Sequence, residues 1–166
     1  MAQRAKLTVS RSASGVVIHV AGAGTISESP VVHAFADQML ADHGQRVTIH
    51  LASCTYMDST FLGGLVSLFR RHGTSGRFAI FAPEPERRVL FGVSRLDTIL
   101  PFVDDLPPAS ADVQSLEINA LASSDELARY VADCHRRLAE LGGAEAAEFA
   151  RVADALGAEL ERNRRH

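Results

Sequence analysis

The chain has 166 residues, of which 46% are hydrophobic and 22% are charged, and its formal net charge is −3. This composition fits one folded domain, or one domain with an appendage, and lacks the basic excess of nucleic-acid-binding proteins. Residues 1–6 lack the apolar core of a signal peptide, and no apolar run approaches the length of a membrane span. We therefore expect a cytoplasmic protein with no nucleic-acid partner and no membrane insertion.

Strand-like and helix-like patterns alternate through the first two-thirds of the chain. Apolar runs predict strands over residues 6–10, 15–21, 47–51 and 77–82, and a return to the sheet over residues 96–103. Helical spacing predicts helices over residues 30–42, 62–69 and 85–91. Such alternation predicts an α/β fold in which helices pack against a mixed sheet.

The composition changes at residues 107–111, which are rich in proline and alanine. Residues 109–122 are weakly patterned and fit either a short strand or a packed linker. Ser123 and Glu126 then form a capping-box-like start, and two amphipathic stretches follow on either side of Gly142. We expect an α/β domain over residues 1–106, a linker over 107–122 and a helical hairpin over 123–166. The hairpin's apolar stripe is expected to pack on the α/β domain or on a second copy of the chain, and a homodimer through these helices follows from the second alternative.

Cysteine and histidine residues give no sign of a metal or cofactor site. Cys54 and Cys134 have neither metal-ligand spacing nor a disulfide framework pattern, so we expect buried free thiols. The histidines are scattered along the chain without metal spacing, for example His19, His50 and His135. We expect no metal and no cofactor.

Residues 56–65 place a hydroxyl group where a strand ends and a helix begins. Backbone N–H groups are free at a helix start and the helix dipole is positive there, so a phosphate on Ser59 is favoured. No Gly-x-Ser-x-Gly elbow surrounds Ser59, and the sequence places no histidine as its base, so we expect no catalytic residue. The pattern predicts a phosphorylation-controlled binding module, although Asp58 and Ser59 also suit a simple helix cap.

Two motifs together resemble the STAS domain of bacterial anti-sigma-factor antagonists over residues 6–106. The first is Tyr56-Met57-Asp58-Ser59-Thr60 followed by Leu62-Gly63. The second is a proline-started helix that ends in Leu90-Phe91 and is followed by Ser94, Leu96 and an Ile-Leu pair. The resemblance implies a sheet of four or five strands with helices packed on one face.

The resemblance also implies a partner-switching mechanism in transcription regulation and stress response. A kinase that is also an anti-sigma factor phosphorylates the serine of the antagonist and is then released, and a phosphatase restores the binding form. Carried onto this sequence, the acceptor is Ser59, with Thr60 as its nearest substitute. The implied partner-binding residues are Asp58, Ser59, Thr60, Phe61 and Gly63.

Three departures from the family pattern leave a second function open. Phe61 stands where glycine is usual, the loop of residues 21–27 is nearly uncharged, and the helical hairpin lies outside the minimal domain. The alternative is a non-catalytic STAS scaffold in a stress-sensing assembly, or an accessory subunit of a lipid-transport ATPase, that uses the same surface without phosphorylation. Gly63 and Gly64 indicate either a close approach by another backbone or plain packing against the sheet.

Overall fold

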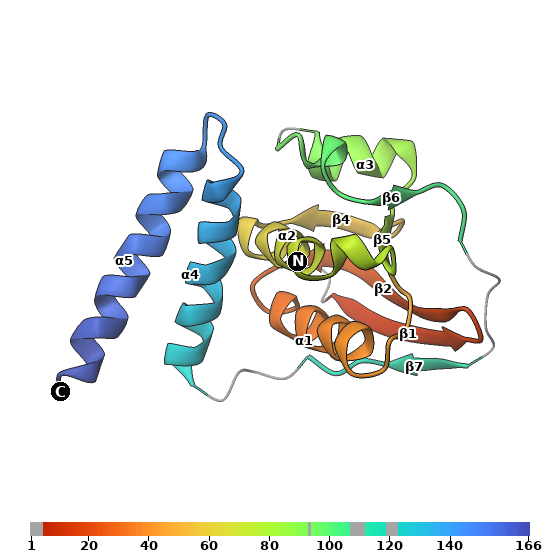
Figure 1. The fold of residues 1–166 in the computed structure, drawn as a ribbon, viewed down its shortest axis with the longest axis horizontal. Helices are drawn as coiled ribbons and strands as arrows, with labels where there is room; N and C mark the ends of the chain where they lie inside the picture. Colours follow the sequence, from red (N-terminus) through yellow and green to blue (C-terminus); the bar gives the residue numbers. More distant parts are fainter. Residues whose placement is uncertain (1–4, 93, 107–111, 119–122) are drawn as a thin grey trace.

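The computed structural model describes residues 5–92, 94–106, 112–118 and 123–166. Within these residues, seven strands form one mixed sheet in the order β6-β5-β3-β2-β1-β7, and β4 pairs with the second half of β2 (Figure 1). The β1/β2 and β1/β7 pairs are antiparallel and the other pairs are parallel. The strands are β1 (Lys6–Ser12), β2 (Gly15–Gly24), β3 (Val47–His50), β4 (Cys54–Met57), β5 (Phe78–Phe81), β6 (Phe102–Val103) and β7 (Val113–Ser115). The predicted α/β fold with a mixed sheet is confirmed.

The sheet contains strands that the sequence patterns did not resolve. β4 lies directly before the Asp58-Ser59 motif and continues the parallel pairing of β2 beyond the end of β3. β7 confirms the short-strand alternative for part of residues 109–122, whereas residues 107–111 and 119–122 lie outside the described residues. The segment predicted to return to the sheet over residues 96–103 contains a shorter strand than expected. Residues 96–98 form a 3₁₀ turn, and only β6 is a strand.

The helices begin close to their predicted starts. They are α1 (Ser29–Ala41), α2 (Ser59–His72), α3 (Glu84–Phe91), α4 (Ser124–Glu140) and α5 (Ala146–Arg164), with 3₁₀ turns η1 (Gly73–Ser75) and η2 (Leu96–Thr98). α2 starts three residues earlier than its apolar spacing predicts, because Asp58 caps it. The hydroxyl of Ser123 accepts a hydrogen bond from the backbone N–H of Glu126 at 3.1 Å, which confirms the predicted cap of α4.

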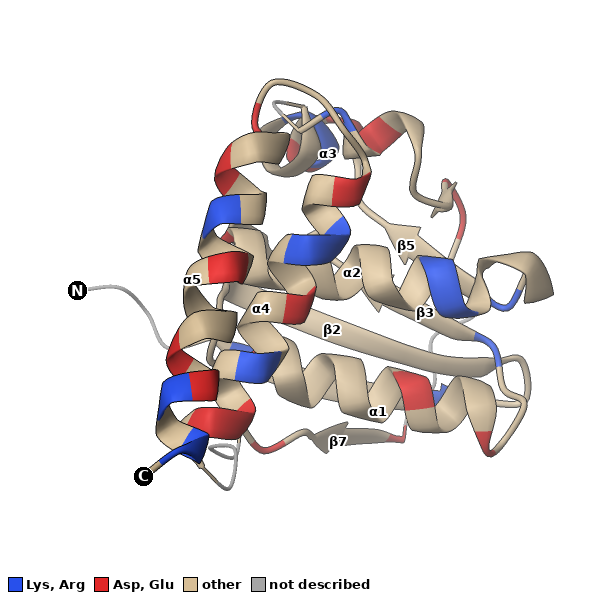
Figure 2. Cartoon of the chain, turned by 60° about the vertical axis from the view of Figure 1, so that its left-hand side comes forward, with Lys and Arg blue, Asp and Glu red and all other residues tan. Residues whose placement is uncertain are grey.

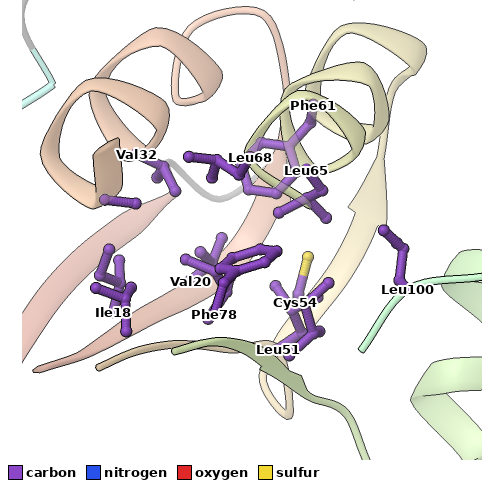
Figure 3. Packing of buried hydrophobic residues seen from close by; sticks show 14 of the residues in the cluster. Ile18, Val20, Val32, Leu51, Cys54, Phe61, Leu65, Leu68, Phe78 and Leu100 are labelled. Carbon is purple, nitrogen blue, oxygen red and sulfur yellow. The ribbon is translucent and has the colours of Figure 1, made fainter. Parts of the chain in front are cut away.

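The hydrophobic core lies between the sheet and the helices α1 and α2 (Figure 3). Alternate residues of β2, such as Ile18 and Val20, face this core, while Phe61, Leu65 and Leu68 enter it from α2. His19 and His50 alternate onto the opposite face of the sheet, where their ring centroids lie 4.5 Å apart.

The C-terminal hairpin packs on the α/β body through α4. Figure 1 shows α4 between α5 and α2, and Leu138 of α4 is part of the main hydrophobic cluster. Figure 2 shows charged residues spread over the solvent side of α4 and along α5. Two packing partners were expected for the apolar stripe, and the structure shows that α4 packs on the body of the same chain. None of the helices within the described residues has the length and apolar character to cross a bilayer.

Candidate functional site

Asp58 holds the N-terminus of α2 in place through both carboxylate oxygens. Its Oδ1 accepts a hydrogen bond from the backbone N–H of Phe61 at 2.9 Å, which caps α2. Its Oδ2 accepts from the backbone N–H of Ile26 at 2.8 Å, which ties the loop after β2 to the same point. The backbone N–H of Asp58 donates to the carbonyl of Gly24 at 3.0 Å. Asp58 therefore acts as a helix cap, as the sequence allowed, and also joins the loop between β2 and α1 to the start of α2.

Ser59 is the first residue of α2 and is half-buried because α4 crosses in front of it. Its Oγ lies 3.0 Å from Nε2 of His135 in α4. The Nδ1 atom of His135 lies 2.8 Å from the carbonyl oxygen of Val131, which can only accept, so Nδ1 carries the proton. In the neutral ring, Nε2 is then the acceptor and the hydroxyl of Ser59 donates to it.

A second polar contact joins the same helix to the body beside Ser59. The hydroxyl of Ser29 in α1 lies 2.8 Å from the phenol oxygen of Tyr130 and donates to the carbonyl of Thr60 at 3.2 Å. Burial raises the pKa of Tyr130 and raises the pKa of the nearby Cys134 thiol to about 12. Both side chains are therefore neutral at physiological pH.

Gly63 and Gly64 permit the close approach of α4 to α2. A Cβ atom at position 63 would lie 2.5 Å from the carbonyl oxygen of Cys134, and one at position 64 would lie 2.7 Å from the phenol oxygen of Tyr130. Any larger residue at position 63 would push the two helices apart, whereas at position 64 it would displace the side chains of Tyr130 and Ser29. Of the two interpretations of this glycine pair, the structure supports the close approach by another backbone.

The expected partner-binding residues do not all lie on the surface. Asp58, Ser59 and Gly63 lie together along the side of α2 that meets α4 and the β2–α1 loop. Thr60 is 4% exposed and Phe61 is 2% exposed, with the Phe61 ring close to Gly24 in the core. Phe61 thus has a packing role in this structure, and a buried Thr60 is a poor substitute for Ser59 as a phosphate acceptor.

The exposed rim of the site is apolar. Tyr56 is 58% exposed on β4 and Ile26 is 38% exposed on the loop after β2, and Asp58 hydrogen-bonds to that loop. Exposed large apolar side chains beside a motif are typical of a protein-binding surface. Tyr56 begins the motif, but neither residue was among the expected partner-binding residues.

Sequence reasoning missed the residues that α4 brings to the site, namely His135, Tyr130 and Cys134. Their sequence signal is the apolar stripe of α4, which predicts burial but not the element on which the helix packs. No group of three or more possible metal ligands occurs among the residues that the structure describes. Both cysteines are free and buried, as predicted.

The Ser59–His135 pair lacks the further parts of a nucleophilic site. The ring of His135 is 7% exposed and packs edge-on against Phe149 with centroids 5.9 Å apart. Its Nδ1 meets a backbone carbonyl of its own helix, where a serine hydrolase has a carboxylate. The arrangement suits the joining of two helices better than an attack on a substrate.

Comparisons with known proteins concern the α/β part of the chain. Residues 7–103 match the family model described as "Mlab, STAS domain". An anti-sigma factor antagonist from Mycobacterium paratuberculosis has a similar fold, with a TM-score of 0.53 and 20% sequence identity over 62% of this chain and 88% of that chain. A candidate anti-sigma factor antagonist from Thermotoga maritima gives a TM-score of 0.46 and 19% identity over 59% of this chain and 86% of that chain. No curated protein matches the sequence.

The family match covers more than half of the chain, including β1 to β6 and the Asp58-Ser59 motif. The hairpin of α4 and α5 lies outside the matched residues. The chain therefore belongs to the STAS domain family and carries a C-terminal helical hairpin that packs on its α2 helix.

Proposed function

We propose that this chain is a cytoplasmic regulatory STAS protein that binds an anti-sigma factor through the surface around Ser59. In this proposal the anti-sigma factor is also the kinase that phosphorylates Ser59, and a phosphatase removes the phosphate. The fold that the chain shares with an anti-sigma factor antagonist supports the class of partner. No step of the proposal requires catalysis by this chain.

The observation that carries the proposal is the position of Ser59 in the first turn of α2, immediately after the cap residue Asp58. Free backbone N–H groups and the positive end of the helix dipole favour a phosphate there. A phosphate adds nearly two negative charges next to the carboxylate of Asp58. A partner that fits the neutral hydroxyl would then meet both repulsion and the cost of removing water from the phosphate.

The experiment that tests the proposal is phosphopeptide mapping of the protein recovered from its own cells, both growing and stressed. We expect phosphate on Ser59 in a fraction that changes with condition, and none on the buried Thr60. A peptide that contains Ser59 and is never phosphorylated in any condition would contradict the switch.

A second candidate function is a constitutive STAS subunit that holds its partner without phosphorylation. The specific observation in its favour is that the hydroxyl of Ser59 is already bonded to His135 beneath α4. Ser59→Ala separates the two candidates in cells. A constitutive subunit should work normally with alanine at this position, whereas a switch should remain permanently in its partner-binding state.

A further inference from the structure

The surface that we propose for partner binding is covered by α4 of the same chain. His135 bonds to Ser59, Tyr130 bonds to Ser29, and the backbone of Cys134 lies directly against Gly63. These contacts form a line along the first two turns of α2, which is the part that contains the motif. A partner that reaches Ser59 and Gly63 must therefore meet α4 first.

The shape of this surface fits a helix. Gly63 and Gly64 are consecutive in α2 and leave a shallow groove, flanked by Ser29 of α1, into which the backbone of α4 enters. Small residues at a crossing point are what allow two helices to pack backbone against backbone. We call the surface formed by Ser29, Ser59, Gly63 and Gly64 the helix groove.

The polar side-chain contacts that hold α4 in the helix groove are few among the described residues. Two of the links are single side-chain hydrogen bonds, Ser59–His135 at 3.0 Å and Ser29–Tyr130 at 2.8 Å. A further polar link among the described residues, Arg70 to Glu140 at 2.6 Å, joins side chains that are 41% and 37% exposed, where water screens the ion pair. Apolar packing is also present, because Leu138 belongs to the main hydrophobic cluster and Leu141 and Phe149 pack against it.

We propose that the helix groove is a general helix-binding surface, that α4 occupies it in the free chain, and that a partner helix replaces α4 there. The identity of the partner rests on the proposed function, whereas the reversible docking of α4 does not. The replacing helix has a small residue where it crosses Gly63 and a hydrogen-bonding side chain that reaches Ser59. It also has an apolar residue in place of Leu138.

The chain contains two thiols that report on this exchange. Cys134 lies in the interface between α4 and α2, and Cys54 lies in β4 inside the body. Burial raises the pKa of both thiols, so neither reacts readily with an alkylating agent while it is covered. Release of α4 exposes Cys134 alone, whereas opening of the whole body exposes both.

The first experiment measures the alkylation rate of each cysteine in the full chain by mass spectrometry, for the wild type, Gly63→Ala and Gly157→Ala. Alanine at position 63 raises the helix propensity of α2 but collides with the carbonyl of Cys134. Gly157→Ala is the matched control in α5, because a Cβ atom there meets nothing within 4 Å.

We expect Gly63→Ala to raise the alkylation rate of Cys134 by about tenfold or more, the factor that corresponds to 1.4 kcal/mol. Cys54 in the same variant, and both cysteines in Gly157→Ala, should keep their wild-type rates. An unchanged rate at Cys134 would show that α4 is a permanent part of the body. A parallel rise at Cys54 would show that the body itself opens, and either result overturns the proposal.

A second experiment tests the exchange with the protein partner that the wild-type chain binds. His135→Ala weakens the docking of α4 but leaves the helix groove open, whereas Gly63→Ala weakens the docking and also fills the groove. We expect about tenfold tighter partner binding for His135→Ala and weaker binding for Gly63→Ala. If the two variants bound the partner with equal affinity, the partner would bind outside the helix groove, and this result would overturn the exchange. The alkylation rates of Cys54 and Cys134 are measured without a partner or a kinase. A Ser59 that is never phosphorylated would therefore contradict the proposed switch but would not affect the test of α4 docking.

Discussion

The phenol of Tyr130 and the hydroxyl of Ser29 lie 2.8 Å apart although they are separated by 101 positions in the chain. Ser29 starts α1 of the α/β body, and Tyr130 lies in α4 of the hairpin. This bond and the Ser59–His135 bond are the two hydrogen bonds of side-chain hydroxyl groups between the body and the hairpin that the described residues show. They provide direct ways to weaken the docking of α4 without changing the core.

Tyr130→Phe should lower the free energy of unfolding by about 0.5–1.5 kcal/mol, the usual net value of one hydrogen bond. Ser29 keeps its bond to the carbonyl of Thr60, so its hydroxyl is not left without a partner. Urea unfolding measures the change. A double-mutant cycle with Ser29→Ala provides the control, because residues in direct contact should show a coupling of at least ~0.5 kcal/mol. Strictly additive effects would mean that the two hydroxyls do not interact in solution.

Asp58→Ala should be more destabilising than the loss of an ordinary helix cap, which costs about 1 kcal/mol. The carboxylate of Asp58 both caps α2 and holds the backbone of Ile26. Asp58→Asn is the graded control, because asparagine caps equally well but offers one acceptor oxygen instead of two. We therefore expect the free energy of unfolding, measured in urea, to fall in the order wild type, Asn, Ala. An Asn variant as unstable as the Ala variant would contradict this division of roles.

The stability of the fold should decrease as the pH falls below about 6.5 because of His19 and His50. Burial lowers the pKa of both side chains from the ordinary value of 6.5, and the neighbouring His19 lowers that of His50 further. The unfolded chain then binds more protons than the folded chain in this range. The contribution of the neutral rings is therefore complete above pH 6.5 and is lost as the pH falls through their folded-state pKa values.

Thermal unfolding of His19→Gln and His50→Gln between pH 5 and pH 8 checks this expectation. Each variant should show a smaller loss of stability towards pH 5 than the wild type. His43→Gln, at an exposed position, serves as the control and should follow the wild-type profile. Parallel profiles for all four proteins would assign the acid sensitivity to other groups.

Ser59→Asp should weaken the binding of the partner by at least about tenfold, which corresponds to 1.4 kcal/mol. The new carboxylate lies beside Asp58 and imitates part of the charge of a phosphate. Ser59→Ala should bind within a few-fold of the wild type, and Thr74→Asp adds the same charge at an exposed position in η1, just beyond the far end of α2. Isothermal titration calorimetry measures the affinities, and equal weakening by Asp at positions 59 and 74 would indicate a nonspecific charge effect.

The sequence predicted those parts of the fold whose signals are local. The alternating apolar residues of β2 and the cap at Ser123 depend on neighbours within a few positions, and both expectations were confirmed. β4 was missed because its two middle residues are exposed, so it lacks an apolar run, and because its ends merge with a turn and with the Asp58 cap. Short strands of this kind are stabilised mainly by pairing, here with β2, which the sequence of the strand itself does not reveal.

The candidate site was predicted in part for the same reason. Asp58 and Ser59 lie within one recognisable motif, and their position at the start of α2 follows from local helix-capping chemistry. The contact between Ser59 and His135 depends on the angle and the register at which α4 crosses α2. These are set by the packing of residues about 70 positions apart, and a single sequence contains no direct record of that pairing. The proposed division into residues 1–106, 107–122 and 123–166 stays a prediction.

Because α4 and the helix groove belong to the same chain, a partner has to compete with the effective concentration of α4 at the groove. Two groups joined by a short connection meet each other at an effective concentration on the order of millimolar. α4 therefore fills the groove for most of the time even if its intrinsic affinity is weak. A partner present at micromolar concentration has to bind roughly a thousandfold more tightly than α4 to occupy half of the grooves. The hairpin thus sets a threshold that selects strong or locally concentrated partners and leaves weak ones unbound.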